Sequence, residues 1–372
     1  MKKTLHNWKE SLLSSLFLLV ATGSLFAQNI SWHNPLKESA LQGRTAALKA
    51  EDAYARLPLN LKTEVREPVW HLGQQAAGIY VEFISNSPEV AVRYKVRNAL
   101  NMPHMPTTGV SGVDLYAKGE KVGDWKWSFG KYKFADTITY DYVNLAVPTG
   151  KGNQYRLYLP LYNAVDWMEI GVKEGASFEF TKNTEKPIIV YGTSIAQGAC
   201  ATRPGLGWTN MLGRNFSQPV INLAFSGNGR LEQPILDLIN EVDAAAYLLD
   251  CIPNLALTKD RSADDLKKLI INAVSTLRKK HPTTPIMLMA HSSSEVPGIM
   301  SKTNLSEYGS SSVVAFETFK EIKAKGDKNL YWVSSQDIGF DIESTVDYAH
   351  PNDIGMKKIS DAYTKALKKI LK

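Results

Sequence analysis

The sequence is poor in cysteine, with two among 372 residues. This excludes a disulfide-dense scaffold and a metal site built from four thiolates. The sequence also lacks a second long apolar run beyond residues 12–27, which excludes a membrane protein with several spans. What remains is 44% hydrophobic and 22% charged, without an internal repeat or a low-complexity tract, as in a globular protein. The length is too great for one small domain and suits two.

Excess positive charge is confined mainly to the C-terminal end. The formal net charge is +6, and residues 356–372 alone carry six lysines against one aspartate. A nucleic-acid groove needs clustered basic residues with interleaved aromatic residues. These lysines instead follow the spacing of an amphipathic helix. We therefore expect a solvated helix face and no nucleic-acid partner.

The N-terminal residues have the pattern of a secretory signal. Lys2, Lys3 and Lys9 precede the apolar residues 12–27, a stretch that small and polar residues interrupt. The pattern predicts a signal peptide over residues 1–27, export to the periplasm or the cell exterior, and no integral membrane segment after cleavage. An uncleaved anchor is the alternative. No cysteine lies near the predicted cut, which excludes a lipid-anchored cysteine.

Residues 28–182 follow a strand-like rhythm. Apolar and polar residues alternate over residues 90–96 and 155–159, and Gly, Pro, Asn and Asp separate such runs at hairpin-like intervals. The rhythm predicts an all-β domain, an antiparallel sandwich or jelly roll. A polar linker follows and ends at Pro187.

Residues 187–372 alternate between short apolar strands and helical patterns. This alternation predicts an α/β domain, a parallel sheet with helices on both faces. Ligand chemistry then belongs at the carboxyl ends of the strands. The expected strands cover residues 187–191, 222–225, 246–250, 285–289 and 330–333.

A serine follows the first of these strands. Ser194 stands close to Gly192, where its hydroxyl can sit at a helix N-terminus whose amides favour developing negative charge. A nucleophilic serine needs this placement, and a serine that merely caps a helix has the same pattern. The spacing of a phosphate-binding loop is absent, and Ala196 breaks the G-x-S-x-G pattern of a nucleophile elbow.

Glycines and an asparagine follow the next two strands. Gly227 and Gly229 come after the second strand, and Asn254 comes after the third. A glycine allows a backbone amide to approach a substrate closely, and an asparagine can aim its side-chain amide at an oxyanion. The structural alternatives are an ordinary turn and an asparagine that organises its own loop.

An aspartate and a histidine precede the last predicted helix. Asp347 and His350 are three residues apart on a turn, so their side chains can touch. The carboxylate would then fix the imidazole tautomer and leave the other ring nitrogen as a general base. His291, at the end of the fourth strand, is the rival base, but it has no carboxylate at such spacing. No spacing suggests zinc, and we expect no metal or cofactor.

These four pieces together resemble the SGNH/GDSL hydrolase superfamily. The serine, the glycine, the asparagine and the terminal Asp-x-x-His occur in the family's order over residues 187–372. The resemblance implies a flavodoxin-like three-layer α/β/α fold. It also implies that Ser194 is the nucleophile, His350 the base and Asp347 the acid that orients it.

The resemblance also implies an oxyanion hole. The amides of Ser194 and Gly227 and the side chain of Asn254 would form it, with Gly229 as the competing amide donor. The first block reads Gly-Thr-Ser where the family has Gly-Asp-Ser, and Asn254 stands in Pro-Asn-Leu where many members have Asn-Asp.

The N-terminal half resembles the GxDLY accessory domain found ahead of such hydrolases in bacteria. Residues 112–116 read GVDLY, and residues 54–58 read YARLP. The implied fold is a small β-sandwich. We expect Trp125 and Trp127 to fill its core, with stacking on a sugar as the alternative.

The combined resemblance implies a secreted serine esterase acting on a small-molecule or glycan ester. Members with this two-domain plan look like carbohydrate-directed esterases, and the absence of a long apolar acyl-binding run favours a short acyl group such as acetyl. The alternatives are an acyl hydrolase of the lipase or thioesterase type, and a glycan-binding protein whose hydrolase site is idle. Export makes a disulfide between Cys200 and Cys251 possible, because both follow strands that neighbour the same site.

Overall fold

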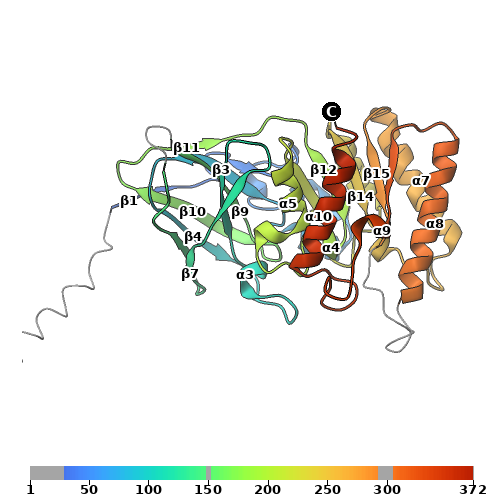
Figure 1. The fold of residues 1–372 in the computed structure, drawn as a ribbon, viewed down its shortest axis with the longest axis horizontal. Helices are drawn as coiled ribbons and strands as arrows, with labels where there is room; N and C mark the ends of the chain where they lie inside the picture. The colour runs from blue at the N-terminus through green and yellow to red at the C-terminus, as the bar shows by residue number, and fades with distance from the viewer. Residues whose placement is uncertain (1–28, 148–151, 292–304, 372) are drawn as a thin grey trace, which may run out of the picture.

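The computed structural model describes residues 29–147, 152–291 and 305–371. Figure 1 shows a sheet-rich N-terminal part beside a C-terminal part in which helices flank a sheet. The predicted signal peptide lies outside the described residues. Across the described ranges, the structure has no helix long and apolar enough to cross a membrane.

The N-terminal part consists of two antiparallel sheets, which confirms the predicted sandwich. In β4 the even-numbered residues Val90, Val92 and Tyr94 are buried, because successive side chains of a strand point to opposite faces. The first sheet has the order β1 (Ile30–His33), β10 (Val165–Lys173), β4 (Val90–Val96), β8 (Ile138–Tyr142) and β7 (Lys131–Lys133). The second has the order β11 (Phe178–Thr181), β3 (Tyr80–Ser85), β9 (Asn153–Tyr158), β5 (Asp114–Lys118) and β6 (Trp125–Ser128), and β2 (Leu41–Gln42) pairs with β3.

Short helical segments of the N-terminal part reach the C-terminal part. Residues 57–72 place Leu57, Val65 and Val69 in the apolar core of the C-terminal sheet. These segments are η1 (Ala50–Asp52), η2 (Leu59–Thr63), α2 (Glu67–Gly73) and α3 (Thr107–Val110). The two parts therefore share a core as well as a linker.

The C-terminal part is built on a parallel sheet, as predicted. Its strands have the order β13 (Val220–Ala224), β12 (Ile188–Gly192), β14 (Ala246–Asp250), β15 (Ile286–Met289) and β16 (Leu330–Val333). In chain order this is 2-1-3-4-5, the flavodoxin-like order, whose switch point lies beside the first strand. The connecting helical segments are α4 (Ser194–Gln197), η3 (Pro204–Leu206), α5 (Trp208–Asn215), α6 (Gln233–Asn240), η4 (Ile252–Asn254), α7 (Ala263–Lys280), α8 (Leu305–Ala324), α9 (Ser335–Ile338) and α10 (Asp353–Leu367).

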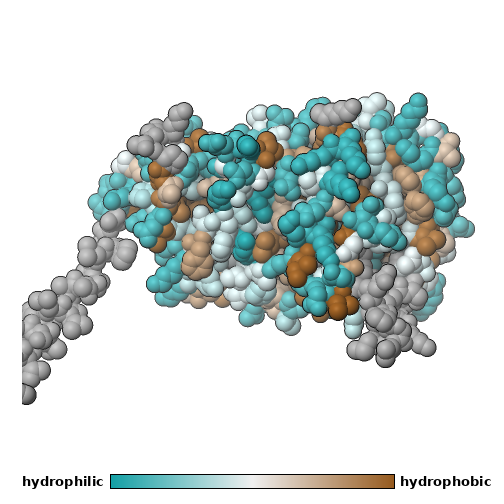
Figure 2. Space-filling model, viewed as in Figure 1, coloured by the Kyte–Doolittle hydropathy of each residue, from teal (hydrophilic) through white to brown (hydrophobic). Residues whose placement is uncertain are grey.

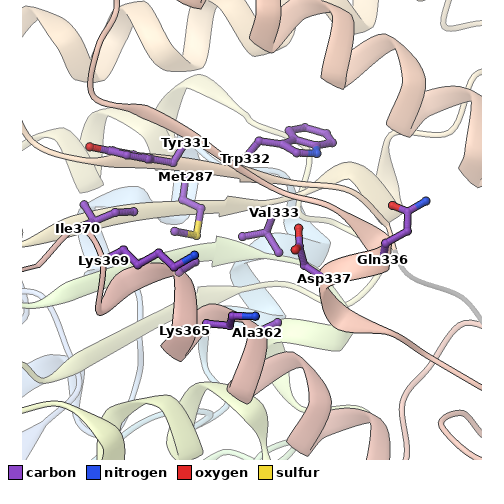
Figure 3. Close-up of a pocket in the computed structure, with 11 residues that line it drawn as sticks. Met287, Tyr331, Trp332, Val333, Gln336, Asp337, Ala362, Lys365, Lys369 and Ile370 are labelled. Carbon is purple, nitrogen blue, oxygen red and sulfur yellow. The ribbon is translucent and has the colours of Figure 1, made fainter.

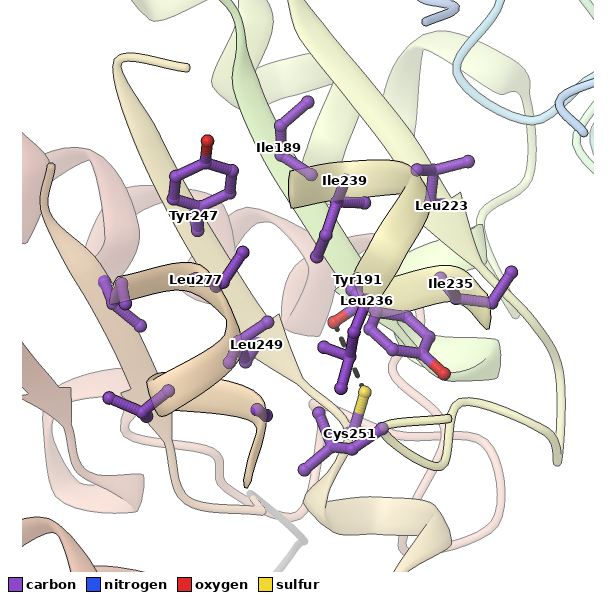
Figure 4. Close-up of a cluster of buried hydrophobic side chains, with 14 of the residues drawn as sticks. Ile189, Tyr191, Leu223, Ile235, Leu236, Ile239, Tyr247, Leu249, Cys251 and Leu277 are labelled. Atoms are coloured by element: carbon purple, nitrogen blue, oxygen red, sulfur yellow. Dashed lines mark hydrogen bonds between the residues drawn. The ribbon is translucent and has the colours of Figure 1, made fainter. Parts of the chain in front are cut away.

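Both faces of the parallel sheet are buried. On one face Tyr191 and Leu249 pack against α6, α7 and α8, as Figure 4 shows for part of the cluster. On the other face Val190 and Leu248 pack against α5 and α10. Because the residues of β12, β13, β14 and β15 are all buried, these strands are continuous apolar runs and do not alternate.

The predicted disulfide is wrong. Cys200 and Cys251 are both buried free thiols. Cys251 lies in the cluster of Tyr191, with its Sγ 3.5 Å from the Tyr191 carbonyl oxygen (Figure 4), whereas Cys200 packs in the cluster of Trp208. The two clusters cover opposite faces of the sheet, so the thiols cannot meet. Burial raises the pKa of Cys200 to about 12, which leaves it unreactive at neutral pH.

The prediction that Trp125 and Trp127 fill the sandwich core is also wrong. Trp127 is 47% exposed, and the guanidinium of Arg203 lies 4.3 Å from its ring centre. The indole N–H of Trp125 donates a hydrogen bond to the Arg214 carbonyl at 3.1 Å. Both tryptophans therefore contact the C-terminal part, and neither belongs to the sandwich interior.

Candidate active site

Three neighbouring strand ends bring the predicted site residues together. Gly192, at the end of β12, is in register with Ala224 of β13 and with Asp250 of β14. Ser194, Gly227 and Asn254 follow these three positions by two, three and four residues. The parallel register thus delivers all three to one edge of the sheet, at its switch point.

Ser194 is the first residue of α4. Thr193 before it is extended, with φ of −107° and ψ of −163°, so the chain turns sharply from strand to helix. The first amides of a helix have no partner within the helix. Within the described ranges the amide of Ser194 donates no hydrogen bond, and Ser194 itself is 6% exposed. A hydroxyl and an unused amide therefore lie side by side.

His350 and Asp347 complete a hydrogen-bonded series with the serine. The Oγ of Ser194 is 2.8 Å from Nε2 of His350, and Nδ1 of His350 is 2.7 Å from Oδ2 of Asp347. The other carboxylate oxygen, Oδ1, accepts the backbone amide of His350 at 2.7 Å. The carboxylate holds the proton on Nδ1, so Nε2 is left to accept the proton of the serine hydroxyl.

The loop that carries His350 is tied to the loop that follows Ser194. The amide of Cys200 donates to the carbonyl of Pro351 at 2.8 Å. The amide and the hydroxyl of Thr202 donate to the carboxylate of Asp353, the first residue of α10, at 2.9 and 2.6 Å. These bonds fix the position of the imidazole relative to the serine, although the two residues are far apart in sequence.

The carboxylate of Asp347 is held in its charged form. Burial alone would raise its pKa, but the hydrogen bonds from the amide and the ring of His350 outweigh burial and lower it. His291, the rival base, differs sharply. Burial, followed by the charge of His350, lowers the pKa of His291 to about 4. His291 is therefore neutral at physiological pH and lies near His350.

Asn254 and the glycine turn form a second set of donors. The Oδ1 of Asn254 accepts the amide of Gly229 at 3.1 Å, which leaves the side-chain NH₂ group of Asn254 as a donor. The amide of Gly227 makes no hydrogen bond within the described part of the chain. Gly227 has φ of +69° and open space where a side chain would begin. The geometry thus favours Gly227 over Gly229 as the free amide.

The sandwich contributes residues that the sequence analysis missed. The hydroxyl of Tyr162 donates to the Ser194 carbonyl at 3.2 Å. The Nε2 of Gln197 donates to Oε1 of Gln75 at 2.5 Å, while its Oε1 accepts the amide of Ser226 at 3.0 Å. The ring of His104 lies 6.2 Å from that of His350. No local sequence signal marks the contacts of Tyr162, Gln75 and His104, because each joins segments from different halves of the chain.

Exposed apolar side chains flank the histidine loop. Figure 2 shows apolar atoms at the end of α10 that is lowest in the view and on the adjoining loop. Along the chain, the exposed side chains of this loop and of the start of α10 are Ile342, Val346, Tyr348 and Ile354, from 47% to 73% exposed. The loop that positions His350 therefore exposes apolar surface.

A separate hollow contains none of the predicted site residues. Figure 3 shows it between β16, α9 and α10, with a cavity volume of about 460 Å³. Its Asp337 accepts hydrogen bonds from the amide and the hydroxyl of Ser334 at 2.9 and 2.6 Å, so this carboxylate caps α9. In the described ranges, no three His, Cys, Asp or Glu side chains gather as a metal ion would need.

A serine, a histidine and an aspartate joined in this order on a parallel sheet are the arrangement that serine hydrolases use. The comparisons with known proteins agree. Residues 185–368 match the model of the GDSL-like lipase/acylhydrolase family, and residues 30–178 match the model of the N-terminus of SGNH-hydrolase-type esterases. The chain belongs to the GDSL-like lipase/acylhydrolase family, and it is an enzyme that hydrolyses esters.

Solved structures share the fold over nearly the whole chain. A Bacteroides ovatus protein classed as a GDSL-like lipase is 30% identical, with a TM-score of 0.81 over 92% of this chain and 98% of that one. A salicylyl-acyltransferase from a tetracycline biosynthetic pathway is 21% identical, with a TM-score of 0.68 over 92% and 97%. A family two carbohydrate esterase from Cellvibrio japonicus is 12% identical, with a TM-score of 0.53 over 92% and 99%. No curated protein matches the chain significantly.

Proposed function

We propose that the chain is an exported esterase that removes short acyl groups, in particular acetyl, from carbohydrates. The observation that carries the proposal is the continuous series from Ser194 through His350 to Asp347, with contacts of 2.8 and 2.7 Å. The carbohydrate esterase among the structural neighbours supports the substrate class. The lysine-led residues 1–27 support export.

In this mechanism Ser194 is the nucleophile. Its Oγ attacks the acyl carbon while His350 Nε2 takes the hydroxyl proton. Asp347 stabilises the imidazolium that forms, and its lowered pKa keeps it ionised throughout. His350 then gives the proton to the departing sugar oxygen. A water molecule attacks the acyl-enzyme by the same proton path in reverse and releases the acid.

Negative charge on the acyl oxygen needs donors that are already in place. The amides of Ser194 and Gly227 and the NH₂ group of Asn254 are the candidates, because none of them is used within the described ranges. Preorganised donors of this kind cost no reorganisation when the charge develops.

A second candidate is hydrolysis of longer or more apolar esters, as by a lipase or thioesterase. The exposed side chains on the loop that carries His350 and at the start of α10 favour it, since exposed apolar surface can bind an acyl chain; they are Ile342, Val346, Tyr348 and Ile354. A series of nitrophenyl esters of increasing chain length separates the two candidates. For an acetylesterase, kcat/KM falls as the acyl chain becomes longer than a few carbons. For a lipase, kcat/KM rises with chain length.

The proposal is tested by replacing the nucleophile. We expect Ser194→Ala to lose about three or more decades in kcat on an acetyl ester. The exposed Ser217→Ala is the matched control and keeps wild-type turnover. Near-wild-type activity of Ser194→Ala would overturn the assignment.

The proposed export is tested separately. N-terminal sequencing of the exported protein should give a first residue near Gln28.

A further inference from the structure

Three arginines meet at the loops that carry the proposed oxyanion donors. Only eleven of the 43 basic residues are arginines, so three at one edge of the sheet form a local concentration. Arg230 follows the glycine turn, Arg261 follows η4, and Arg66 comes from the N-terminal part, one residue before α2.

Each guanidinium bonds to one of the two loops. The Nε and Nη2 of Arg230 donate to the carbonyl of Gly227 at 3.3 and 3.1 Å. The Nη1 of Arg261 donates to the carbonyls of Asn254 and Ala256 at 3.4 and 3.0 Å. The Nη1 of Arg66 donates to Oδ1 of Asn228 at 2.8 Å. The charges are thus fixed next to Gly227 and Asn254, where the reacting oxygen would lie.

The three charges are close enough to repel one another. Burial, followed by the charges of Arg66 and Arg261, lowers the pKa of Arg230, and Glu232 opposes this effect. Glu232 is the carboxylate that pairs with Arg66. Within the described ranges neither Arg230 nor Arg261 has an ion-pair partner. Three positive charges with one carboxylate as counter-ion repel one another, and an anionic ligand bound among them would lower this electrostatic energy.

The arginines also keep unused donors. A guanidinium has five N–H groups in a planar fork that matches an oxyacid anion. Arg230 directs two of its nitrogens to a single carbonyl oxygen, and Arg261 uses one nitrogen. We propose that Arg66, Arg230 and Arg261 form a subsite for an anionic substituent, a carboxylate or a sulfate, on the glycan that carries the ester. This inference rests on the proposed esterase function and narrows its substrate to acidic glycans.

The test compares kcat/KM on three acetylated oligosaccharides: one of hexuronates, one sulfated and one neutral. Wild type prefers the charged members, and the preferred one identifies the anion. The acidic-to-neutral ratio falls about tenfold in Arg230→Gln, the effect of one charge-assisted hydrogen bond. The ratio falls further in the double variant Arg66→Gln/Arg230→Gln. In Arg230→Lys, which keeps the charge, the ratio lies between those of wild type and Arg230→Gln. Added salt reduces the ratio, because the arginines are partly exposed.

Arg97→Gln is the matched control. Arg97 is an exposed arginine of the sandwich, paired with Asp166 at 2.7 Å, and its loss leaves the ratio unchanged. A wild-type ratio of one or less, or an unchanged ratio in Arg230→Gln, overturns the subsite while the esterase proposal stands. If no ester is cleaved, the esterase proposal fails, and calorimetry decides the subsite. The unesterified hexuronate or sulfated oligosaccharide binds Ser194→Ala, and binds Ser194→Ala/Arg230→Gln about tenfold more weakly. Equal binding by the two variants, or no binding of either oligosaccharide, overturns the subsite.

Discussion

The two halves of the molecule contribute to the site in different ways. The parallel sheet carries every proposed reacting group, because its strands end at one edge and their loops converge there. The sandwich carries none of them. It instead supports the loops from outside, through Tyr162 on the Ser194 carbonyl and Gln75 on Gln197. The residues proposed to react therefore come from the C-terminal half, and residues that hold their loops in place come from the N-terminal half.

Arg56 is the clearest case of support. Arg56 is 1% exposed, and its guanidinium donates to the carbonyls of Asn222 and Ala224 at 3.2 and 2.7 Å. It also donates to Leu72 and Gln75 of its own half, at 2.7 and 2.8 Å. Burial lowers the pKa of Arg56 to about 9. One side chain therefore joins the sandwich segment to the end of β13, just before the glycine turn.

The largest effect should come from the parallel half. Asp347→Asn should lower kcat by about three to four decades, because the amide no longer fixes the imidazole tautomer. Steady-state kinetics on an acetyl ester measures this. Asp166→Asn, on the sandwich surface, is the control and should be neutral. A loss below tenfold would place the proton path elsewhere.

Asn254→Ala should cost about two to three decades in kcat, since one preorganised donor is lost. KM should change little, because the charge develops only in the transition state. Asn272→Ala, on the exposed side of α7, provides the comparison. A change in KM alone would contradict the role of Asn254 as an oxyanion donor.

Arg56→Met tests the support from the sandwich half. It removes the guanidinium donor from four carbonyls, and we expect a loss of about 3–5 kcal/mol in the free energy of unfolding. Urea denaturation of the full chain measures it. Arg97→Met, at an exposed ion pair, should change stability by less than about 1 kcal/mol. Equal stability of both variants would show that the halves are not joined through Arg56.

The last prediction concerns the pH dependence of stability and Asp250, at the end of β14. Burial, opposed by a hydrogen bond from Tyr363, raises its pKa from 3.8 to about 7. Between these values the folded chain binds a proton that the unfolded chain has lost, so stability falls as pH rises from about 4 to about 7. Asp250→Asn should remove this part of the pH dependence. The measurement is the free energy of unfolding of both proteins at several pH values across that range. The same decrease with pH in both would contradict the prediction.

Reasoning from the sequence succeeded where local pattern and strand register decide the outcome. The five short apolar runs predicted the parallel sheet, and its register then placed Ser194, Gly227 and Asn254 together. Asp347 and His350 were predictable because they are three residues apart on one turn. The choice between Gly227 and Gly229 needed coordinates, since it depends on which amide Asn254 accepts.

The errors concern contacts between distant segments. The prediction of a Cys200–Cys251 disulfide was wrong because the sequence does not show on which face of the sheet a loop residue packs. Trp127 was expected in the sandwich core, but it lies beneath Arg203 of the other half. Likewise, no periodicity in the sandwich indicates that Tyr162 reaches Ser194.

The most direct test is covalent labelling by a serine-directed phosphonate, followed by peptide mass spectrometry. The hydrogen-bonded series predicts one modified residue, Ser194, and little modification in His350→Ala, whose serine has lost its base. Absence of label on Ser194, or equal labelling in His350→Ala, would contradict the proposed roles of these residues.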